Sequence, residues 1–210
     1  HSRLKTNLIV LDKLDEETRV QAFTDIFDDS QWLISLVENL LSVTRLEEGR
    51  MNFNMSVQLM DEVIDEALKH INRKSCEHKI STEYKSELMT ARMDAKLIMQ
   101  VIINIVDNAI KYTPSGSEIK VTAEKCSDTV SVSIADNGSG ITDENKSRVF
   151  DMFFTGDREI ADSHRSLGLG LYLCRSIINA HGGEITLKDN TPQGCVFTFT
   201  LPSDEVDINE

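Results

Sequence analysis

The chain has 210 residues, of which 40% are hydrophobic, and it carries a formal net charge of −13. This length suits one ordinary domain with an appendage, and the presence of only 3 prolines and 10 glycines indicates a globular chain. The acidic balance argues against nucleic acid and acidic membrane surfaces as partners, because both attract basic patches. No apolar run approaches the roughly 20 residues of a membrane-spanning helix, and no signal peptide is visible.

The four cysteines are widely spaced, without a CxxC pair or a neighbouring histidine at metal-ligand spacing. We interpret them as buried thiols in a reducing compartment. They are Cys76, Cys126, Cys174 and Cys195.

The first 48 residues have a helical pattern. Residues 1–11 resemble the end of a short amphipathic helix, and Asp15 is placed to cap a longer one. Apolar residues then recur at steps of three and four up to Gly49, with no glycine or proline between. Such heptads favour a long helix in an antiparallel hairpin that dimerises into four helices. The alternative is a long helix packed on its own globular domain. We place the domain boundary near residues 49–52.

The rest of the chain intersperses strands and helices. This order predicts an α+β sandwich, in which helices cover one face of an antiparallel or mixed sheet. The expected strands are 51–57, 78–84, 89–93, 119–123, 130–134, 185–187 and 197–201. The expected helices are 60–71, a helix capped by Asp94 that runs to about residue 112, and 168–181.

A polar stripe marks the helix that follows Asp94. Its members lie at i, i+4, i+7, i+8 and i+11, which stack on one helix face. An amide oxygen is a hard donor suited to Mg²⁺, and lysine answers phosphate charge. The alternative is a solvated helix face. The stripe consists of Gln100, Asn104, Asp107, Asn108 and Lys111.

Two glycine turns lie downstream. Asp136-Asn137-Gly138-Ser139-Gly140 follows a strand, and a carboxylate there can accept a hydrogen bond from the exocyclic amine of adenine but would repel the carbonyl of guanine. Gly168-Leu169-Gly170-Leu171 opens a helix whose first amides can face an anion. The alternatives are a plain turn and a flexible turn before a core helix. No P-loop is present, and no GxGxxG opens a βαβ unit.

Residues 142–167, between these turns, are largely polar apart from Val149-Phe150 and Met152-Phe153-Phe154. Such a segment is typical of a mobile lid that phenylalanines pin when it closes. The alternative is a loop with a small satellite core. Its basic and histidine residues are Lys146, Arg148, Arg158, His164 and Arg165.

In this order and spacing, the elements resemble the N, G1, F and G2 boxes of the sensor histidine kinase ATP-binding domain. Its superfamily includes gyrase and Hsp90-type chaperones. The resemblance covers residues 52–202, and VENLLSVTRLEEG resembles the second helix of the family's dimerisation and phosphotransfer hairpin. Together with LDEETR, it also resembles KdpD-type kinases, which govern potassium uptake. The resemblance implies a two-layer, Bergerat-type fold after a long-helix hairpin. The implied domains are a hairpin (1–49), an ATP-binding domain (50–204) and an acidic tail (205–210).

The resemblance also implies residue roles. Asn108 would ligate Mg²⁺, with Asn104 and Lys111 on the phosphate side, and Asp136 would hold the adenine amine. Asn104 stands where hydrolysing relatives carry a glutamate that activates water, and an amide cannot act as that base. Further ATP contacts would be Tyr112, Gly138, Gly140, Ile141, Gly168, Leu169, Gly170 and Leu171. The lid would use Phe150, Phe153 and Arg165.

The implied activity is a histidine kinase of a two-component system that uses ATP with Mg²⁺. The γ-phosphoryl group would pass to a hairpin histidine and then to an aspartate of a response-regulator receiver domain. We expect a homodimer through the hairpin, no nucleic acid partner, and a cytoplasmic location within a membrane-anchored parent. The rival readings are a degenerate nucleotide-binding signalling module without kinase activity, and a chaperone- or gyrase-like ATPase.

Three departures from the family pattern stand out. The phosphoacceptor motif H-[DE]-x-R-T-P is absent, because Ser2 stands at its histidine position and Asn7 at its proline. We therefore expect the acceptor upstream of residue 1, with His1 as a minor alternative. Thr155 replaces a common lid arginine, and Ser166 replaces a glycine that often precedes GLGL. Three other histidines are expected at the surface or at helix ends: His70, His78 and His181.

Overall fold

The structure is a computed structural model that describes residues 15–71, 77–156 and 168–204. The chain divides into two compact units, residues 1–41 and 42–210, and helix α2 (Glu16–Glu47) runs through the division. As expected, Asp15 caps α2, because its Oδ1 accepts a hydrogen bond of 2.8 Å from Thr18 N. Gly49, with φ +63°, follows the helix end. The expected first arm of the hairpin, with His1 and Ser2, lies outside the described residues.

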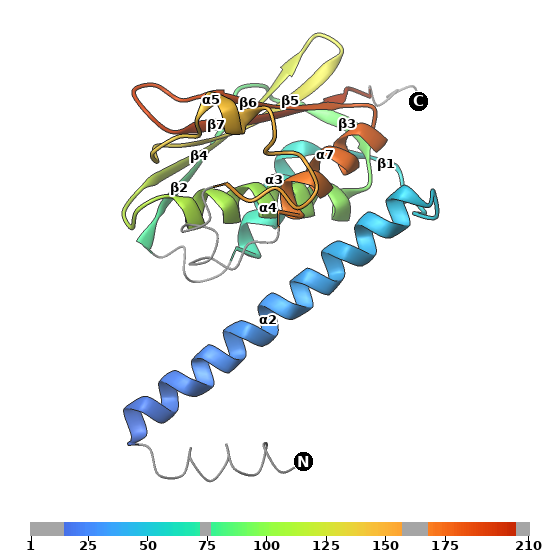
Figure 1. The fold of residues 1–210 in the computed structure, drawn as a ribbon. Helices are drawn as coiled ribbons and strands as arrows, with labels where there is room; N and C mark the ends of the chain where they lie inside the picture. The colour runs from blue at the N-terminus through green and yellow to red at the C-terminus, as the bar shows by residue number, and fades with distance from the viewer. Residues whose placement is uncertain (1–14, 72–76, 157–167, 205–210) are drawn as a thin grey trace. The chain divides into compact units, whose positions relative to one another are not determined.

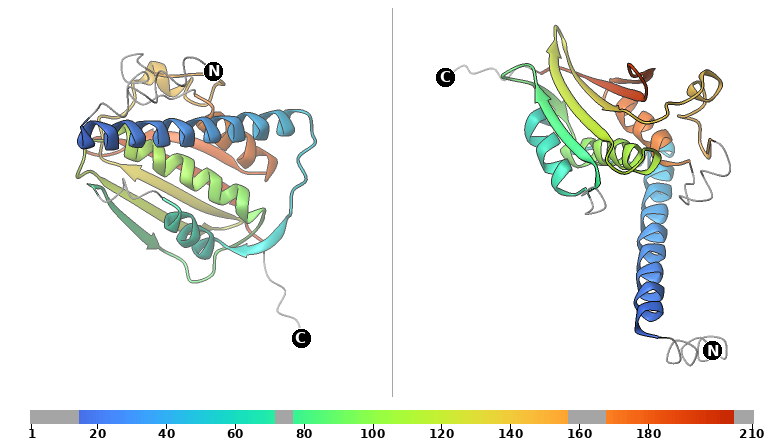
Figure 2. Two further views of the ribbon diagram at one scale, coloured as in Figure 1. Left: turned by 90° about the horizontal axis from the view of Figure 1, so that it is seen from below. Right: turned by 90° about the vertical axis from the view of Figure 1, so that its left-hand side faces the viewer.

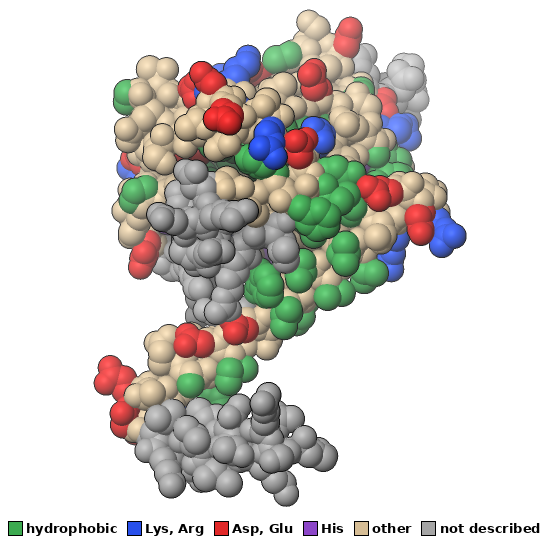
Figure 3. Space-filling view, in the orientation of Figure 1, with side chains coloured by type: hydrophobic (Ala, Val, Ile, Leu, Met, Phe, Trp, Pro, Cys, Tyr) green, Lys and Arg blue, Asp and Glu red, His purple; other side chains and the backbone are tan. Residues whose placement is uncertain are grey.

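One face of α2 exposes a strip of large apolar side chains, part of which is visible in Figure 3. These side chains are 44–61% exposed, at spacings that place them along one side of the helix. A long helix with such a face gains stability when another apolar face covers it. We call this set the α2 strip: Val20, Phe23, Ile26, Phe27, Leu33, Ile34, Val37, Leu40 and Leu41.

The second compact unit begins inside α2. Val43 is only 2% exposed, and Leu46 packs against the core of this unit. Tyr172 Oη also donates a hydrogen bond of 3.0 Å to Glu47 Oε1. The last helical turns of α2 therefore belong to the second compact unit, and the domain boundary expected near residues 49–52 stays a prediction.

The main sheet has five strands in the order β2-β4-β5-β7-β6 (Figure 1). β2 pairs with β4 in parallel, and the other pairs are antiparallel. A separate antiparallel pair joins β1 and β3. The strands are β1 (Ser56–Leu59), β2 (Lys79–Tyr84), β3 (Thr90–Met93), β4 (Glu118–Cys126), β5 (Thr129–Asp136), β6 (Glu184–Asp189) and β7 (Cys195–Pro202).

Helices α3 (Met60–Lys69), α4 (Ala95–Tyr112) and α7 (Gly170–Ala180) lie on one face of this sheet (Figure 2). Side chains along β5 and β7 alternate between buried and half-buried, as expected when helices cover one face. The core between the layers includes the fully buried Ile102, Ile105 and Phe199. The expected α+β two-layer sandwich with a mixed, mostly antiparallel sheet is confirmed.

α4 begins where its sequence predicts. Asp94 Oδ1 accepts hydrogen bonds from Lys96 N (3.1 Å) and Leu97 N (3.4 Å), which satisfies amides that the first turn leaves unpaired. The helix ends at Tyr112, before the Thr113-Pro114 turn. Its apolar face packs into the core, so the polar stripe is held in a fixed orientation. None of the described helices has the length and apolar character needed to cross a membrane.

Two expectations were wrong in detail. The first strand begins at Ser56 rather than at Met51, because residues 51–55 approach β1 without pairing. Cys126 is exposed rather than buried, because it lies at the tight β4–β5 hairpin. Cys174 and Cys195 are buried, as expected, and Cys76 lies outside the described residues.

Candidate functional site

The polar stripe of α4 meets the start of α7. Asn104 and Asn108 are half-buried, whereas Lys111 is exposed one turn further along. The Nδ2 atom of Asn104 is shielded from solvent and has no hydrogen-bonded oxygen or nitrogen partner, and interaction with Asn104 opposes the rise in pKa that burial causes in the Cys174 thiol. A Cβ atom built on Gly170 would lie 4.0 Å from Asn104 Cγ. An unpaired, buried donor therefore lies beside the glycine that opens α7, where a ligand oxygen could satisfy it.

Asp107 adds negative charge to this stripe. Burial raises the pKa of its carboxyl above 3.8, and the positive charge of Lys111 opposes that rise. Gln100 is half-buried one turn before Asn104, and Tyr112 is 40% exposed. The stripe thus runs from a partly buried amide end to an exposed cationic end.

Asp136 ends β5 and is only 8% exposed. Its Oδ1 accepts hydrogen bonds from Gly138 N (2.9 Å) and Cys195 N (3.3 Å). Burial raises the pKa of this carboxyl, while the two amide donors oppose the rise. A buried carboxylate oriented by main-chain donors has the chemistry to read a ligand amine.

Gly138 joins this turn to the end of α4. A Cβ atom there would lie 2.7 Å from Thr113 Cγ2 and 3.0 Å from Asp136 Oδ1, so only glycine fits without rearrangement. Thr113 Oγ1 donates to Ala109 O (2.7 Å) and lies 3.0 Å from His78 Nε2. Thr113, the residue after α4, therefore packs directly on the turn that carries Asp136. Ile141, downstream, packs against the core.

Gly168 and Phe154 lie against each other at the two ends of residues 155–167. A Cβ atom on Gly168, which has φ +66°, would lie 2.2 Å from Phe154 O. Phe153 N also donates a hydrogen bond of 3.1 Å to Gly168 O. Leu169 is buried and Leu171 packs against the core, so the GLGL segment is anchored beside the ends of the lid.

The lid phenylalanines differ in their roles. Phe150 is 9% exposed and makes an edge-to-face contact with Phe197, with ring centroids 6.2 Å apart. Phe153 is 58% exposed and has a φ of +62°, a strained value for a bulky residue. Phe150 therefore packs against the sheet, whereas Phe153 is largely exposed, and the role of both residues in a lid stays a prediction. Arg165 lies outside the described residues.

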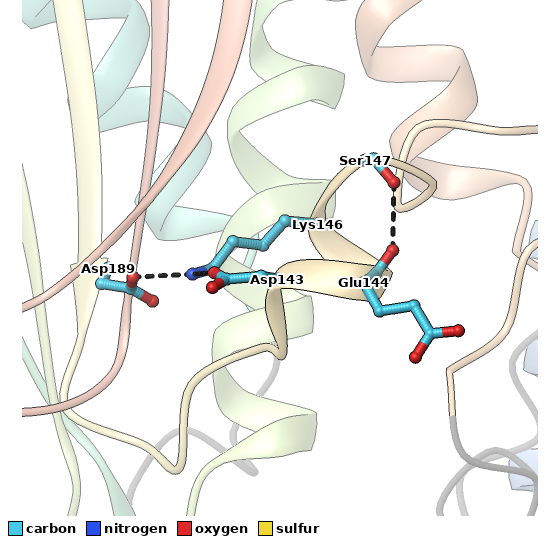
Figure 4. A network of polar contacts seen from close by, with 5 residues as sticks. All are labelled: Asp143, Glu144, Lys146, Ser147 and Asp189. Atoms are coloured by element: carbon cyan, nitrogen blue, oxygen red, sulfur yellow. Dashed lines mark hydrogen bonds and ion pairs between the residues drawn. The ribbon is translucent and has the colours of Figure 1, made fainter.

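Lys146 ties the first turn of the lid to the sheet (Figure 4). It ends the short helix α5 (Asp143–Lys146), and its Nζ lies 2.6 Å from both Asp143 Oδ1 and Asp189 Oδ2. The hydrogen bonds to these carboxylates raise the pKa of Lys146. The sequence placed Lys146 in the lid but gave no sign of its partner at the end of β6.

The turn between β6 and β7, residues 190–194, is a part of the site that sequence reasoning missed. Asn190 Nδ2 donates a hydrogen bond of 2.7 Å to Asp136 O, and Gln193 Nε2 lies 3.4 Å from Asn137 O. The only sequence signal was the turn-forming composition of N-T-P-Q-G. That composition predicts a turn, but it does not indicate that the turn contacts Asp136 and Asn137.

Within the described residues, no three acidic, histidine or cysteine side chains are grouped to hold a metal ion. Mg²⁺ that arrives with a nucleotide is held by few protein ligands together with phosphates and water, and amide oxygens can serve among them. The buried, unpaired amide of Asn104, one turn from Asn108, gives a donor for a phosphate oxygen beside an amide ligand for the ion. The residues present therefore fit a magnesium–phosphate group.

Residues 93–205 match the family model of histidine kinase-, DNA gyrase B- and HSP90-like ATPases. The chain belongs to this family. It is 38% identical over 191 residues to sensor protein KdpD of Clostridium acetobutylicum, covering 91% of this chain and 21% of that protein. It is 31% identical to sensor protein SrrB of Staphylococcus aureus, covering 86% of this chain and 31% of SrrB. The chain thus spans well under half the length of these two relatives.

Solved structures agree with the fold. The catalytic domain of histidine kinase ThkA matches with a TM-score of 0.63 and 33% identity, over 73% of this chain and 99% of that one. ThkA in complex with response regulator protein TrrA matches with a TM-score of 0.69 and 27% identity, over 97% of this chain and 57% of that one. The resemblance inferred from the four boxes is therefore confirmed at the level of family and fold.

Proposed function

We propose that the chain is the catalytic core of a sensor histidine kinase in a two-component system. It binds Mg-ATP and passes the γ-phosphoryl group to a histidine of the helical hairpin and then to a response-regulator aspartate. The observation that carries this proposal is Asn104. Its buried, unpaired Nδ2 lies beside Gly170, where a phosphate oxygen would satisfy it.

One group of site residues binds the adenine base, and another group binds the phosphates. Asp136 accepts a hydrogen bond from the adenine amine, and Gly138 lets Thr113 pack closely against the turn that carries this carboxylate. The amides of the Gly168–Gly170 segment and the Lys111 ammonium face the phosphates. Mg²⁺, held by the Asn108 amide oxygen, supplies charge neutralisation on the phosphate oxygens.

Asn104 also favours transfer over hydrolysis. A side-chain amide cannot take a proton from water, so water near the phosphate lacks a general base from this position. Transfer of the phosphoryl group to an acceptor that the protein holds in position is then favoured over hydrolysis. This argues against the rival reading of a chaperone- or gyrase-like ATPase.

The partners belong to the same proposal. The α2 strip supports a homodimer through the hairpin, with residues 1–49 as the dimerisation part, 50–204 as the ATP-binding part and 205–210 as a tail. A receiver domain is supported by the ThkA–TrrA complex, and a KdpD-type role by the 38% identity. The relatives' names as sensor proteins support a cytoplasmic position in a membrane-anchored parent.

The degenerate-module alternative has one specific observation in its favour. The sequence lacks the motif H-[DE]-x-R-T-P that carries the phosphoacceptor histidine in the family. We expect the acceptor upstream of residue 1. The two proposals agree on nucleotide binding and differ on phosphoryl transfer.

Calorimetry with Mg-ATP and Mg-GTP tests the nucleotide site itself. ATP should bind at least about tenfold more tightly than GTP, since a guanine carbonyl would face the Asp136 carboxylate. Asp136→Asn should weaken ATP binding by about 1–3 kcal/mol through loss of a charged hydrogen bond. Equal affinities for ATP and GTP would remove Asp136 from the role of base reader.

A further inference from the structure

In the β6–β7 turn, the side chain of Asn190 is fixed by hydrogen bonds of both its amide nitrogen and its amide oxygen. Asn190 Nδ2 donates to Asp136 O at 2.7 Å, while Asn190 Oδ1 accepts from Thr191 N at 2.9 Å. The main-chain N of Asn190 donates to Gly194 O at 2.9 Å. Because both the amide nitrogen and the amide oxygen are engaged, the rotamer of Asn190 is fixed against the end of β5.

The same turn approaches Asp136 at a second point. A Cβ atom on Gly194, which has φ +112°, would lie 2.0 Å from Asp136 O, so the backbone contact is too close for any side chain. Cys195 N, the next amide, donates to Asp136 Oδ1 at 3.3 Å. The turn and the residue after it therefore contact Asp136 at both its main-chain oxygen and its carboxylate.

These contacts leave the two carboxylate oxygens unequal. Both described hydrogen bonds to the Asp136 carboxylate, from Gly138 N and Cys195 N, reach Oδ1. Oδ2 is then the oxygen available to a ligand amine. Its direction depends on the backbone orientation of Asp136, which Asn190 restrains through the main-chain oxygen.

We propose that Asn190 is a positioning residue for base recognition. Its hydrogen bond to Asp136 O aims Oδ2 at the exocyclic amine of the purine and so sets discrimination between adenine and purines that lack this amine. The inference rests on the proposed function, in which Asp136 reads the base. Asn190 acts from behind Asp136 and does not touch the nucleotide.

The turn itself is braced from outside. Asp189, the residue before Asn190, forms the 2.6 Å ion pair with Lys146 at the root of the lid. The Lys146 side chain is 18% exposed, so this contact is partly shielded from solvent. The residue before Asn190 is thereby tied to α5.

Calorimetry on the folded protein tests this with two probes, Mg-ATP and the Mg-triphosphate of purine riboside, which lacks the exocyclic amine. The unmodified protein should prefer ATP by at least about tenfold, and Asn190→Ala should reduce that preference about fivefold, the worth of one misplaced hydrogen bond. Lys188→Ala is the matched control, because Lys188 is an exposed residue of β6, two positions before Asn190 and outside the turn. It should leave the preference unchanged.

The ratio of the two nucleotide affinities distinguishes a positioning role of Asn190 from a purely structural one. A purely structural Asn190 would weaken both nucleotides equally, leaving their ratio unchanged, and that result would overturn the inference while leaving the proposed function intact. No preference in the unmodified protein would overturn both. If Asn190→Ala fails to fold, Asn190→Asp keeps the size and the Oδ1 acceptor but loses the donor, and it must show the same fall in preference.

Discussion

The main-chain oxygen of Phe154 lies only 2.2 Å from the position that a Cβ atom would take on Gly168. The two ends of the lid segment are therefore in backbone contact, and the hydrogen bond from Phe153 N to Gly168 O strengthens that contact. Gly168 is also the first residue of the GLGL segment. The contact with Phe154 is thus made by the first residue of the segment whose amides we propose to face the phosphates.

Gly168→Ala should destabilise the protein by about 2–5 kcal/mol, because it adds a steric clash to the cost of a left-handed backbone. It should also weaken Mg-ATP binding, because the following amides must shift. Urea unfolding and calorimetry measure the two effects. Gly116→Ala is the matched control, since Gly116 has φ +85° but nothing within 4 Å of its added Cβ. It should cost only about 1–2 kcal/mol and leave ATP affinity unchanged; equal effects of the two variants would show that the contact with Phe154 does not matter.

Asp136→Asn should affect stability and binding in opposite directions. Burial raises the pKa of Asp136 above its ordinary value of 3.8, so the folded protein retains this proton to a higher pH than the unfolded chain does. Stability contributed by the protonated form is present below 3.8 and is lost as pH rises through the folded pKa. Asparagine does not ionise, so it avoids that loss while its oxygen can keep the hydrogen bonds from Gly138 N and Cys195 N.

Without nucleotide, Asp136→Asn should therefore be at least as stable as the unmodified protein at pH 7. Its relative gain should shrink as the pH falls toward 3.8. Urea unfolding at a series of pH values measures this difference. If the variant is clearly less stable than the unmodified protein at pH 7, the ionised Asp136 carboxylate must stabilise the fold, and the expected cost of burying its charge is wrong.

His181 is expected to matter for stability rather than for the nucleotide. It is 5% exposed at the end of α7, where Nδ1 donates to Ile177 O (2.8 Å) and Nε2 accepts from Asp94 N (3.1 Å). His181→Leu would leave the Asp94 amide unpaired and should cost about 1–3 kcal/mol in urea unfolding. His70→Leu, at an exposed helix end, should change stability by less than about 0.5 kcal/mol. Similar costs for the two variants would contradict this assignment.

The sequence predicts most of this fold because the strongest patterns are local. The α4 periodicity with its Asp94 cap, and the alternation along β5 and β7, depend on neighbouring residues and were read correctly. The order of the four motifs, which resembles that of the family, also pointed to the two glycine turns as parts of one site. The long-range contacts could not be predicted, because nothing near Asn190 or Lys146 indicates that Asp136 and Asp189 lie beside them. The start of β1 was missed because residues 51–55 alternate like a strand but find no pairing partner.

The α2 strip predicts self-association. Replacing Phe27 and Ile34 by aspartate would place charges in an apolar seam, so the protein should become monomeric in sedimentation experiments. Ser35→Asp is the control, because Ser35 lies on the helix outside the strip and is exposed. It should leave the oligomer unchanged. An oligomer that survives the double substitution would place the dimer interface elsewhere.

Phosphoryl transfer to histidine tests the central claim most directly. The parent chain, including its hairpin, should be incubated with Mg-ATP carrying a labelled γ-phosphate, beside the same chain with Asn108→Ala. We predict an acid-labile, base-stable label on histidine in the first. The variant should lose the label but retain part of its ATP affinity, because the Asp136 pocket remains. A parent chain that binds ATP but never labels histidine, or one that rapidly hydrolyses ATP with Asn104 in place, would contradict the account.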